Sequence, residues 1–111
     1  MPEIAVPGRR LRAAIPGVYA GYAALQTAAM GDGALPATVK ELIALAISAT
    51  RECDGCVAAH ARSAVRQGVT AEEVAEAMGV VIAMNGGPGT VWGPRAYAAF
   101  EEFAAAAADR G

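Results

Sequence analysis

The amino-acid sequence predicts an all-α fold. Over half of its 111 residues are apolar, and alanine, which loses no side-chain entropy in a helix, is the commonest type. Apolar residues recur at three- and four-residue spacing, and proline or glycine separates these segments from one another. No segment has the alternating pattern rich in β-branched residues that is typical of a strand. We therefore expect a bundle of about five helices, with no sheet and no repeat of solenoid length.

The first 14 residues are predicted to be an N-terminal arm with some helix in it. They contain two prolines, a glycine and three arginines, a composition that favours a mobile or partner-docking tail. The first full helix is expected from Pro16 to Met30, because proline is tolerated at a first helical position. One face of this helix is apolar, and Gly31, Asp32 and Gly33 end it; the apolar face consists of Val18, Tyr22, Leu25 and Ala29.

Two helices are expected in the middle of the chain. The first begins at Pro36 and ends near Thr50, and the second begins at Cys53 or Asp54 and ends at Gln67. Gly68 is the expected left-handed terminator of the second. The first should bury a broad apolar face made of Val39, Leu42, Ile43, Ala46 and Ile47.

Two further helices complete the prediction. The run Thr70-Ala71-Glu72-Glu73 has the pattern of a capping box, so a helix should begin there and end at Asn85. The run 86–89, Gly-Gly-Pro-Gly, is the clearest break in the chain. The last helix is expected from Pro94, or from Pro88, to Ala108. Its aromatic residues are predicted to lie in the core or at a subunit interface; they are Trp92, Tyr97, Phe100 and Phe103.

Length and charge limit the possible functions. A chain of 111 residues has room for one domain, and its formal net charge of −2 disfavours nucleic acid as a partner. No apolar run approaches the roughly 18–20 residues that cross a bilayer, and no signal-peptide core follows the N-terminal arginines. We therefore expect a cytoplasmic protein. Because alanine fills little volume and a small chain buries a low fraction of its surface, we also expect a homo-oligomer.

The residues that carry chemistry lie between Arg51 and His60. Cys53 and Cys56 are three residues apart at a predicted helix start, so they share a face and could close a disulfide. The unpaired N–H groups and partial positive charge at a helix N-terminus favour the reactive thiolate. His60, the single histidine of the chain, lies one turn after Cys56 and could exchange a proton with a thiol or a leaving oxygen. The helix dipole favours Cys53 as the reactive sulfur, whereas the histidine favours Cys56.

Other uses of a cysteine pair fit the sequence less well. A structural zinc ion needs four ligands, and Cys53, Cys56 and His60 supply three; Glu41 would be the fourth, although such sites prefer sulfur and nitrogen. Haem attachment requires a histidine directly after the second cysteine, where this chain has Val57. A thioredoxin-like motif would follow a strand, and no strand is predicted. We therefore expect no metal and no cofactor.

The run from Glu41 to Ser48, followed by Cys53-x-x-Cys56-x-x-x-His60, resembles the alkylhydroperoxidase D branch of the carboxymuconolactone decarboxylase family. The resemblance covers roughly Leu35 to Phe103 and includes the Gly-Gly-Pro segment and the aromatic last helix. It implies an all-α bundle around a helical hairpin, assembled as a trimer or a hexamer.

The resemblance also implies an activity. Cys56 would attack a peroxide oxygen and become a sulfenic acid, and Cys53 would resolve it as a disulfide. His60 and Glu41 would form the proton relay, and a lipoyl-bearing or thioredoxin-like dithiol donor would reduce the disulfide. The best-known members of the family have a histidine directly before the second cysteine, where this chain has Gly55. That departure implies a shorter relay and weaker peroxidase activity.

The prediction is therefore a thiol-dependent peroxidase or disulfide oxidoreductase. One alternative is a decarboxylase acting on a lactone of aromatic degradation, although decarboxylases of the family generally lack the pair formed by Cys53 and Cys56. The other alternative is a redox sensor without enzymatic turnover, which exchanges its disulfide with a partner protein.

Overall fold

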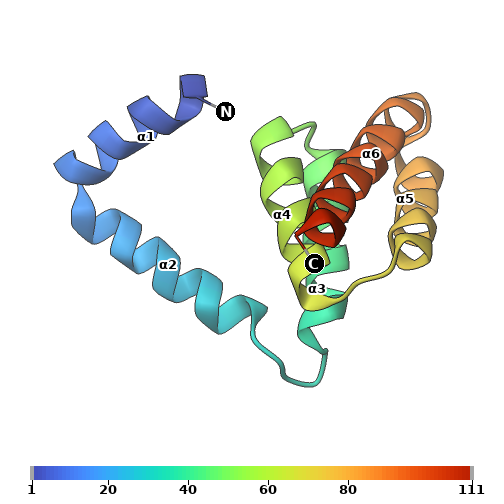
Figure 1. The fold of residues 1–111 in the computed structure, drawn as a ribbon, viewed down its shortest axis with the longest axis horizontal. Helices are drawn as coiled ribbons and strands as arrows, with labels where there is room; N and C mark the ends of the chain where they lie inside the picture. Colours follow the sequence, from blue (N-terminus) through green and yellow to red (C-terminus); the bar gives the residue numbers. More distant parts are fainter. Residues whose placement is uncertain (1, 111) are drawn as a thin grey trace. The chain divides into compact units, whose positions relative to one another are not determined.

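A computed structural model describes residues 2–110, with side-chain surroundings from Pro7 onward, and confirms the all-α prediction. These residues form six helices and no strand (Figure 1). The chain divides between Gly31 and Asp32 into two compact units. The helices are α1 (Pro2–Ala14), α2 (Pro16–Met30), α3 (Ala37–Thr50), α4 (Asp54–Gln67), α5 (Ala71–Asn85) and α6 (Gly87–Asp109).

The predicted all-α bundle of about five helices is confirmed, and the described residues contain one helix more. The additional helix is α1, in the segment expected to be an arm with only some helix. Pro7 lies inside α1, and a proline there removes one backbone hydrogen bond without ending the helix. Residues on both sides of Pro7 therefore belong to one helix, and only Ile15 separates it from α2.

The first unit, which contains α1 and α2, has little core of its own. The predicted bounds of α2 are confirmed, but none of its residues is buried. Val18, Tyr22 and Leu25, which form its apolar face, are each more than half exposed. The α2 face is therefore apolar as predicted, and the described residues of its own unit do not bury it.

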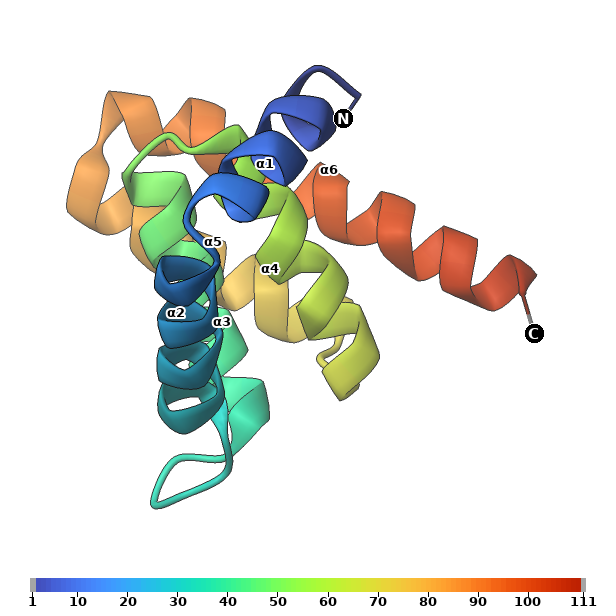
Figure 2. The same ribbon diagram turned by 90° about the vertical axis from the view of Figure 1, so that its left-hand side faces the viewer.

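The second unit contains the hydrophobic core. In two perpendicular views α4 lies beside α3, and α6 packs against α4 and α5 (Figures 1 and 2). Small residues make up much of the core, and Leu45 and Val74 are its largest fully buried side chains. The pair formed by α3 and α4 is the expected helical hairpin. The buried core residues are Leu45, Ala49, Val57, Ala61, Ala64, Val69, Val74, Met78, Val81, Ala96 and Phe100.

Local signals in the sequence identified several helix ends correctly. Gly68 has a φ of 84° and ends α4 in the left-handed conformation. The capping box of α5 is reciprocal: Glu73 N–H donates to Thr70 Oγ1 at 3.1 Å, and Thr70 N–H donates to Glu73 Oε1 at 2.8 Å. Pro36 and Cys53 are the N-caps of α3 and α4, each one position before the first helical residue.

The predicted buried face of α3 was partly wrong. Ile43 and Ile47 are 45% and 53% exposed, whereas Glu41 and Ser48 lie on the buried side of the helix. An apolar stripe this broad covers more of the helix than one packing partner can bury. Contacts with α4, α5 and α6 therefore determine which face of α3 is buried, and that face contains two polar residues.

The predicted break at residues 86–89 is confined to Gly86. This residue has a φ of 66° and a ψ of −132°, and α6 begins at the next residue. The expected start at Pro94 was therefore wrong, and the alternative start at Pro88 is one residue from the observed one. Pro88 lies at the second helical position, where its missing N–H costs no intrahelical bond.

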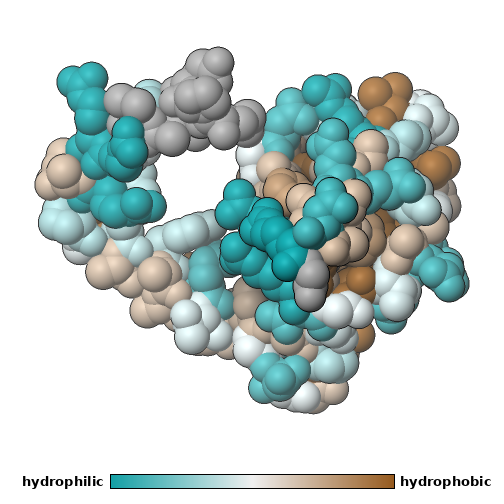
Figure 3. Space-filling view, viewed as in Figure 1, coloured by the Kyte–Doolittle hydropathy of each residue, from teal (hydrophilic) through white to brown (hydrophobic). Residues whose placement is uncertain are grey.

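Apolar side chains also gather on the outer surface of the second unit. Figure 3 shows them over α5 and the first turns of α6. Val80, Met84 and Val91 are 61%, 79% and 57% exposed. Among residues 2–110, no helix is long and apolar enough to cross a membrane.

Replacing Gly89 with alanine is expected to destabilise the second unit. A Cβ at this buried position would lie 2.8 Å from Ile82 Cα and 2.9 Å from Val81 O, both backbone atoms of α5. Overpacking of this kind costs about 1–3 kcal/mol or more. Gly79→Ala is the matched control, because nothing lies within 4 Å of the added Cβ. In urea unfolding, Gly79→Ala should be stabilised by up to about 1 kcal/mol. Equal midpoints for both variants would contradict this packing.

Candidate redox site

The two predicted cysteines lie at the start of α4 and are joined in a disulfide. Their Cα atoms are 5.2 Å apart. Cys53 is the N-cap of α4, and its Sγ accepts a hydrogen bond from the backbone N–H of Cys56 at 3.3 Å. Cys53 is partly buried, whereas Cys56 is exposed. The pair therefore lies at the surface, with Cys56 as the more exposed residue.

A tight turn after α3 positions the cysteines. Cys53 N–H donates to Ser48 O at 3.1 Å, and Glu52 N–H donates to Ala49 O at 3.1 Å. Glu52 has a φ of 54°, a left-handed conformation that residues with a side chain seldom adopt. This turn reverses the chain and fixes the start of α4 against the end of α3.

The hairpin also brings Glu41 of α3 against two residues of α4. His60 Nδ1 and Glu41 Oε1 are 3.0 Å apart, and Ser63 Oγ donates to Glu41 Oε2 at 2.6 Å. Glu41 is 5% exposed, while the His60 side chain is 26% exposed. Both carboxylate oxygens are engaged, so the buried group is held in one orientation between two partners.

This arrangement determines the role of each imidazole nitrogen. A carboxylate accepts hydrogen bonds, so the network assigns the Nδ1 proton to the bond with Glu41. Nε2 then remains as an acceptor. Cys56 and His60 are four residues apart in α4 and so lie on the same face of the helix. Among the described residues, Glu41 thus bonds His60 and Cys53 is linked to Cys56, but His60 forms no hydrogen bond with either sulfur.

Ser63 belongs to this site and was missed in the sequence. Serine is common on exposed helix faces, and nothing in its type marks it. The signal that could have identified it is its spacing, because Ser63 follows His60 by three residues and therefore shares its face of α4.

Replacing Ser63 with alanine is expected to lower the free energy of unfolding by about 1–3 kcal/mol, because it leaves a buried carboxylate oxygen of Glu41 without its donor. Ser63→Thr keeps the hydroxyl and should lose less. Ser48→Ala is the matched control, since among the described residues the buried Ser48 hydroxyl bonds only Ala44 O of its own helix, at 2.7 Å. Urea unfolding of the three variants measures the difference. A loss in Ser48→Ala as large as that in Ser63→Ala would contradict a special role for the Glu41 contact.

A second polar contact lies beside the cysteines. Arg95 of α6 lies 3.2 Å from the Asp54 carboxylate. Its guanidinium also lies over the Trp92 ring, 4.5 Å from the centroid. Asp54 is the first residue of α4, as predicted for a helix-start residue. Both side chains of the pair are more than half exposed, so the pair contributes little to stability.

The described residues offer no ready metal site. No three His, Cys, Asp or Glu residues among them are grouped so that they could hold a metal ion. The four residues of the predicted site instead form two separate contacts, the disulfide and the hydrogen bond between His60 and Glu41.

The site lies on a helical hairpin and combines a cysteine pair with a histidine one turn later, and this histidine bonds a buried glutamate. This combination of fold and site is characteristic of one protein family. The chain belongs to the carboxymuconolactone decarboxylase family, whose sequence profile matches residues 16–109. The predicted membership of the carboxymuconolactone decarboxylase family is thereby confirmed.

Individual relatives agree with this assignment. A crystal structure of a carboxymuconolactone decarboxylase family protein from Legionella pneumophila is 36% identical, with a TM-score of 0.87 over 92% of this chain and 91% of that one. An uncharacterized protein of Cupriavidus necator is 41% identical over 78% of this chain and 76% of its own length. An uncharacterized protein from the cox locus of Paracoccus denitrificans is 33% identical over 73% of each chain.

Proposed function

We propose that the protein is a thiol-dependent peroxidase of the alkylhydroperoxidase D type, which reduces hydroperoxides through Cys53 and Cys56. The observation that carries this proposal is the disulfide at the start of α4, one helical turn before a histidine oriented by a buried glutamate. Membership of the carboxymuconolactone decarboxylase family is compatible with it.

The first half of the cycle begins with both cysteines reduced. His60 Nε2 takes the proton of Cys56, and Glu41 stabilises the imidazolium that forms. The thiolate attacks the terminal oxygen of the hydroperoxide, and the O–O bond breaks. His60 returns its proton to the alkoxide that leaves, so an alcohol is released. Cys56 becomes a sulfenic acid, having given two electrons to the peroxide.

In the second half of the cycle Cys53 resolves the sulfenic acid. Its thiolate attacks the sulfur of Cys56, and the hydroxide that leaves is protonated to water. The sum is one hydroperoxide and one dithiol converted to one alcohol, one water and one disulfide. The hydrogen bond from Cys56 N–H to Cys53 Sγ would stabilise negative charge on Cys53 during this attack.

Exposure supports Cys56 as the attacking sulfur. Cys56 is exposed, whereas Cys53 is partly buried at the N-cap, so a peroxide from solution meets Cys56 first. An external dithiol would likewise reach Cys56 first when it reduces the disulfide. The proposed donor is a lipoyl-bearing or thioredoxin-like protein, and the proposed location is the reducing cytoplasm.

Gly55 determines how long the proposed relay is. Apart from chain neighbours and the backbone of its own helix, nothing lies within 4 Å of a Cβ added at this position, and glycine itself offers no group that exchanges protons. The relay would then consist of Cys56, His60 and Glu41 alone.

We also propose that the protein is a homo-oligomer, a trimer or a hexamer. The uncovered apolar face of α2 and the exposed apolar side chains over α5 and α6 support self-association, because soluble monomers seldom expose such patches.

A turnover assay tests the proposed function. The reduced protein is mixed with tert-butyl hydroperoxide and excess dihydrolipoamide, and peroxide loss is followed per chain. A peroxidase consumes many equivalents. A redox sensor is oxidised but turns over slowly, and a decarboxylase consumes none. Either of the last two results would overturn the proposal.

A further inference from the structure

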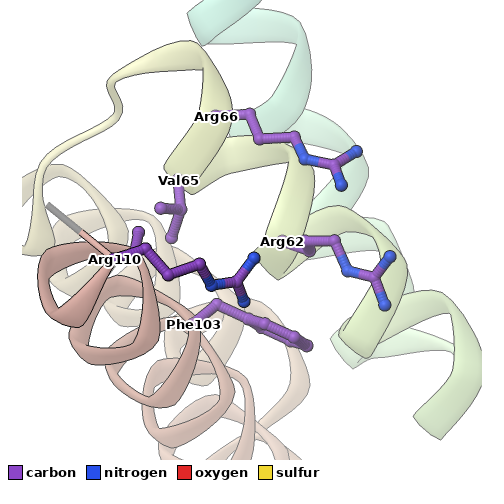
Figure 4. Close-up of a pocket in the computed structure, with 6 residues that line it drawn as sticks. Arg62, Val65, Arg66, Phe103 and Arg110 are labelled. Carbon is purple, nitrogen blue, oxygen red and sulfur yellow. The ribbon is translucent and has the colours of Figure 1, made fainter.

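A cavity of about 380 Å³ lies between α4 and the C-terminal half of α6. Figure 4 shows Arg62 and Arg66 extending from α4, Phe103 extending from α6, and Arg110 extending from the residue that follows α6. The walls also contain apolar side chains, Val65 of α4 and Ala107 of α6. The volume is in the range of cavities that hold small ligands.

Three positive charges line this cavity, and no negative side chain does. Within residues 7–110, no carboxylate forms an ion pair with Arg62, Arg66 or Arg110, although the chain has 11 acidic residues. Arg95, by contrast, is paired with Asp54 at 3.2 Å. Acidic residues are therefore available in the sequence but are not placed at this cavity.

Helix stability and packing explain only part of the positive charge at this cavity. Arg62 and Arg66 are one helical turn apart on α4, a spacing at which like charges repel. Arg66 lies in the last turn of α4 and Arg110 is the C-cap of α6, where each helix C-terminus attracts positive charge, but neither terminus provides a full negative charge. Arg62 also covers the Phe103 ring, 5.5 Å from its centroid, a contact that packing alone would explain. Packing explains neither Arg66 nor Arg110.

We propose that this cavity binds a small organic anion, with a carboxylate or phosphate head on an apolar body. Planar guanidinium groups bind such oxyanions through paired hydrogen bonds. Phe103, Val65 and Ala107 provide the apolar wall that an inorganic ion would not need. The guanidinium groups therefore indicate an oxyanion head, and the apolar wall indicates an apolar body.

The cavity is distinct from the redox site. Arg62 and Arg66 belong to the C-terminal half of α4, whereas the disulfide lies at its first turn. This inference does not depend on the proposed peroxidase activity, and either could fail without the other.

Calorimetric titration of the full chain with benzoate and with phenyl phosphate tests the proposal. At least one of the two should bind at low ionic strength, more weakly as salt is added. Arg66→Gln removes the charge but keeps a polar side chain, and should weaken that binding about tenfold, which corresponds to roughly 1.4 kcal/mol. Arg51→Gln, an exposed arginine outside the cavity, is the matched control and should bind like the wild type.

Neutral and inorganic probes determine whether both features of the ligand matter. Benzyl alcohol should not bind, and inorganic phosphate should bind more weakly than phenyl phosphate. The proposal is overturned if neither organic anion binds, if the combined Arg62→Gln and Arg66→Gln variant binds as the wild type does, or if inorganic phosphate matches phenyl phosphate. Circular dichroism of each variant establishes that the helices are intact.

Discussion

Replacing Cys56 with serine is expected to abolish hydroperoxide turnover and to leave Cys53 as a free thiol after exposure to peroxide. Serine has nearly the shape of cysteine but cannot form a sulfenic acid under these conditions, so the first chemical step is lost. Cys53 is partly buried and bonded at the N-cap, and should react far more slowly. Thiol titration before and after one equivalent of an organic hydroperoxide measures the difference.

Cys53→Ser is the matched variant for this experiment. It keeps the attacking sulfur and loses the resolving one, so its intact mass should rise by one oxygen, as expected for a sulfenic acid that cannot proceed to a disulfide. If Cys53→Ser is instead inert while Cys56→Ser is oxidised, the two cysteines have the opposite roles.

Replacing His60 with asparagine is expected to slow the oxidation of Cys56 by about 10²-fold or more at neutral pH, the usual contribution of a positioned general base. Asparagine can still donate to Glu41, so the buried carboxylate keeps a partner. The rate should recover in alkaline solution, where a thiol ionises without help. Stopped-flow measurement of thiol loss against pH tests this.

Two results would contradict the role given to His60. One is a rate unchanged by the substitution, and the other is a deficit that is constant at every pH. The second would indicate that asparagine disturbs the structure, since a structural defect is not repaired by ionising the thiol. Ala59→Asn, on the exposed surface of the same helix turn, is the control for an added polar side chain.

Much of the fold could be predicted because helix ends depend on local chemistry. Gly68 and the capping box at Thr70 act through hydrogen bonds within a few residues, so their sequence is sufficient. The face of α3 was harder, because Ile43 and Ile47 are apolar yet exposed. Which sector of a helix is buried depends on distant elements, and local periodicity does not contain that information.

The same distinction applies to the candidate site. The disulfide between Cys53 and Cys56 follows from spacing within one helix turn. The contact of Glu41 with His60 joins residues 19 positions apart, and only the resemblance to a family pointed to it. Ser63, 22 positions from Glu41, was not part of that resemblance. A donor to a buried carboxylate is recognisable only when the hairpin is folded.

The most direct test of the central claim is the fate of the two thiols in the wild-type protein. The fully reduced chain is mixed with one equivalent of an organic hydroperoxide, and free thiols and intact mass are measured on the same sample. We predict that both thiols are lost within each chain and that the mass falls by two hydrogen atoms, with no oxygen gained. Thiols that survive the peroxide, or a disulfide that forms only between chains, would contradict the dithiol mechanism.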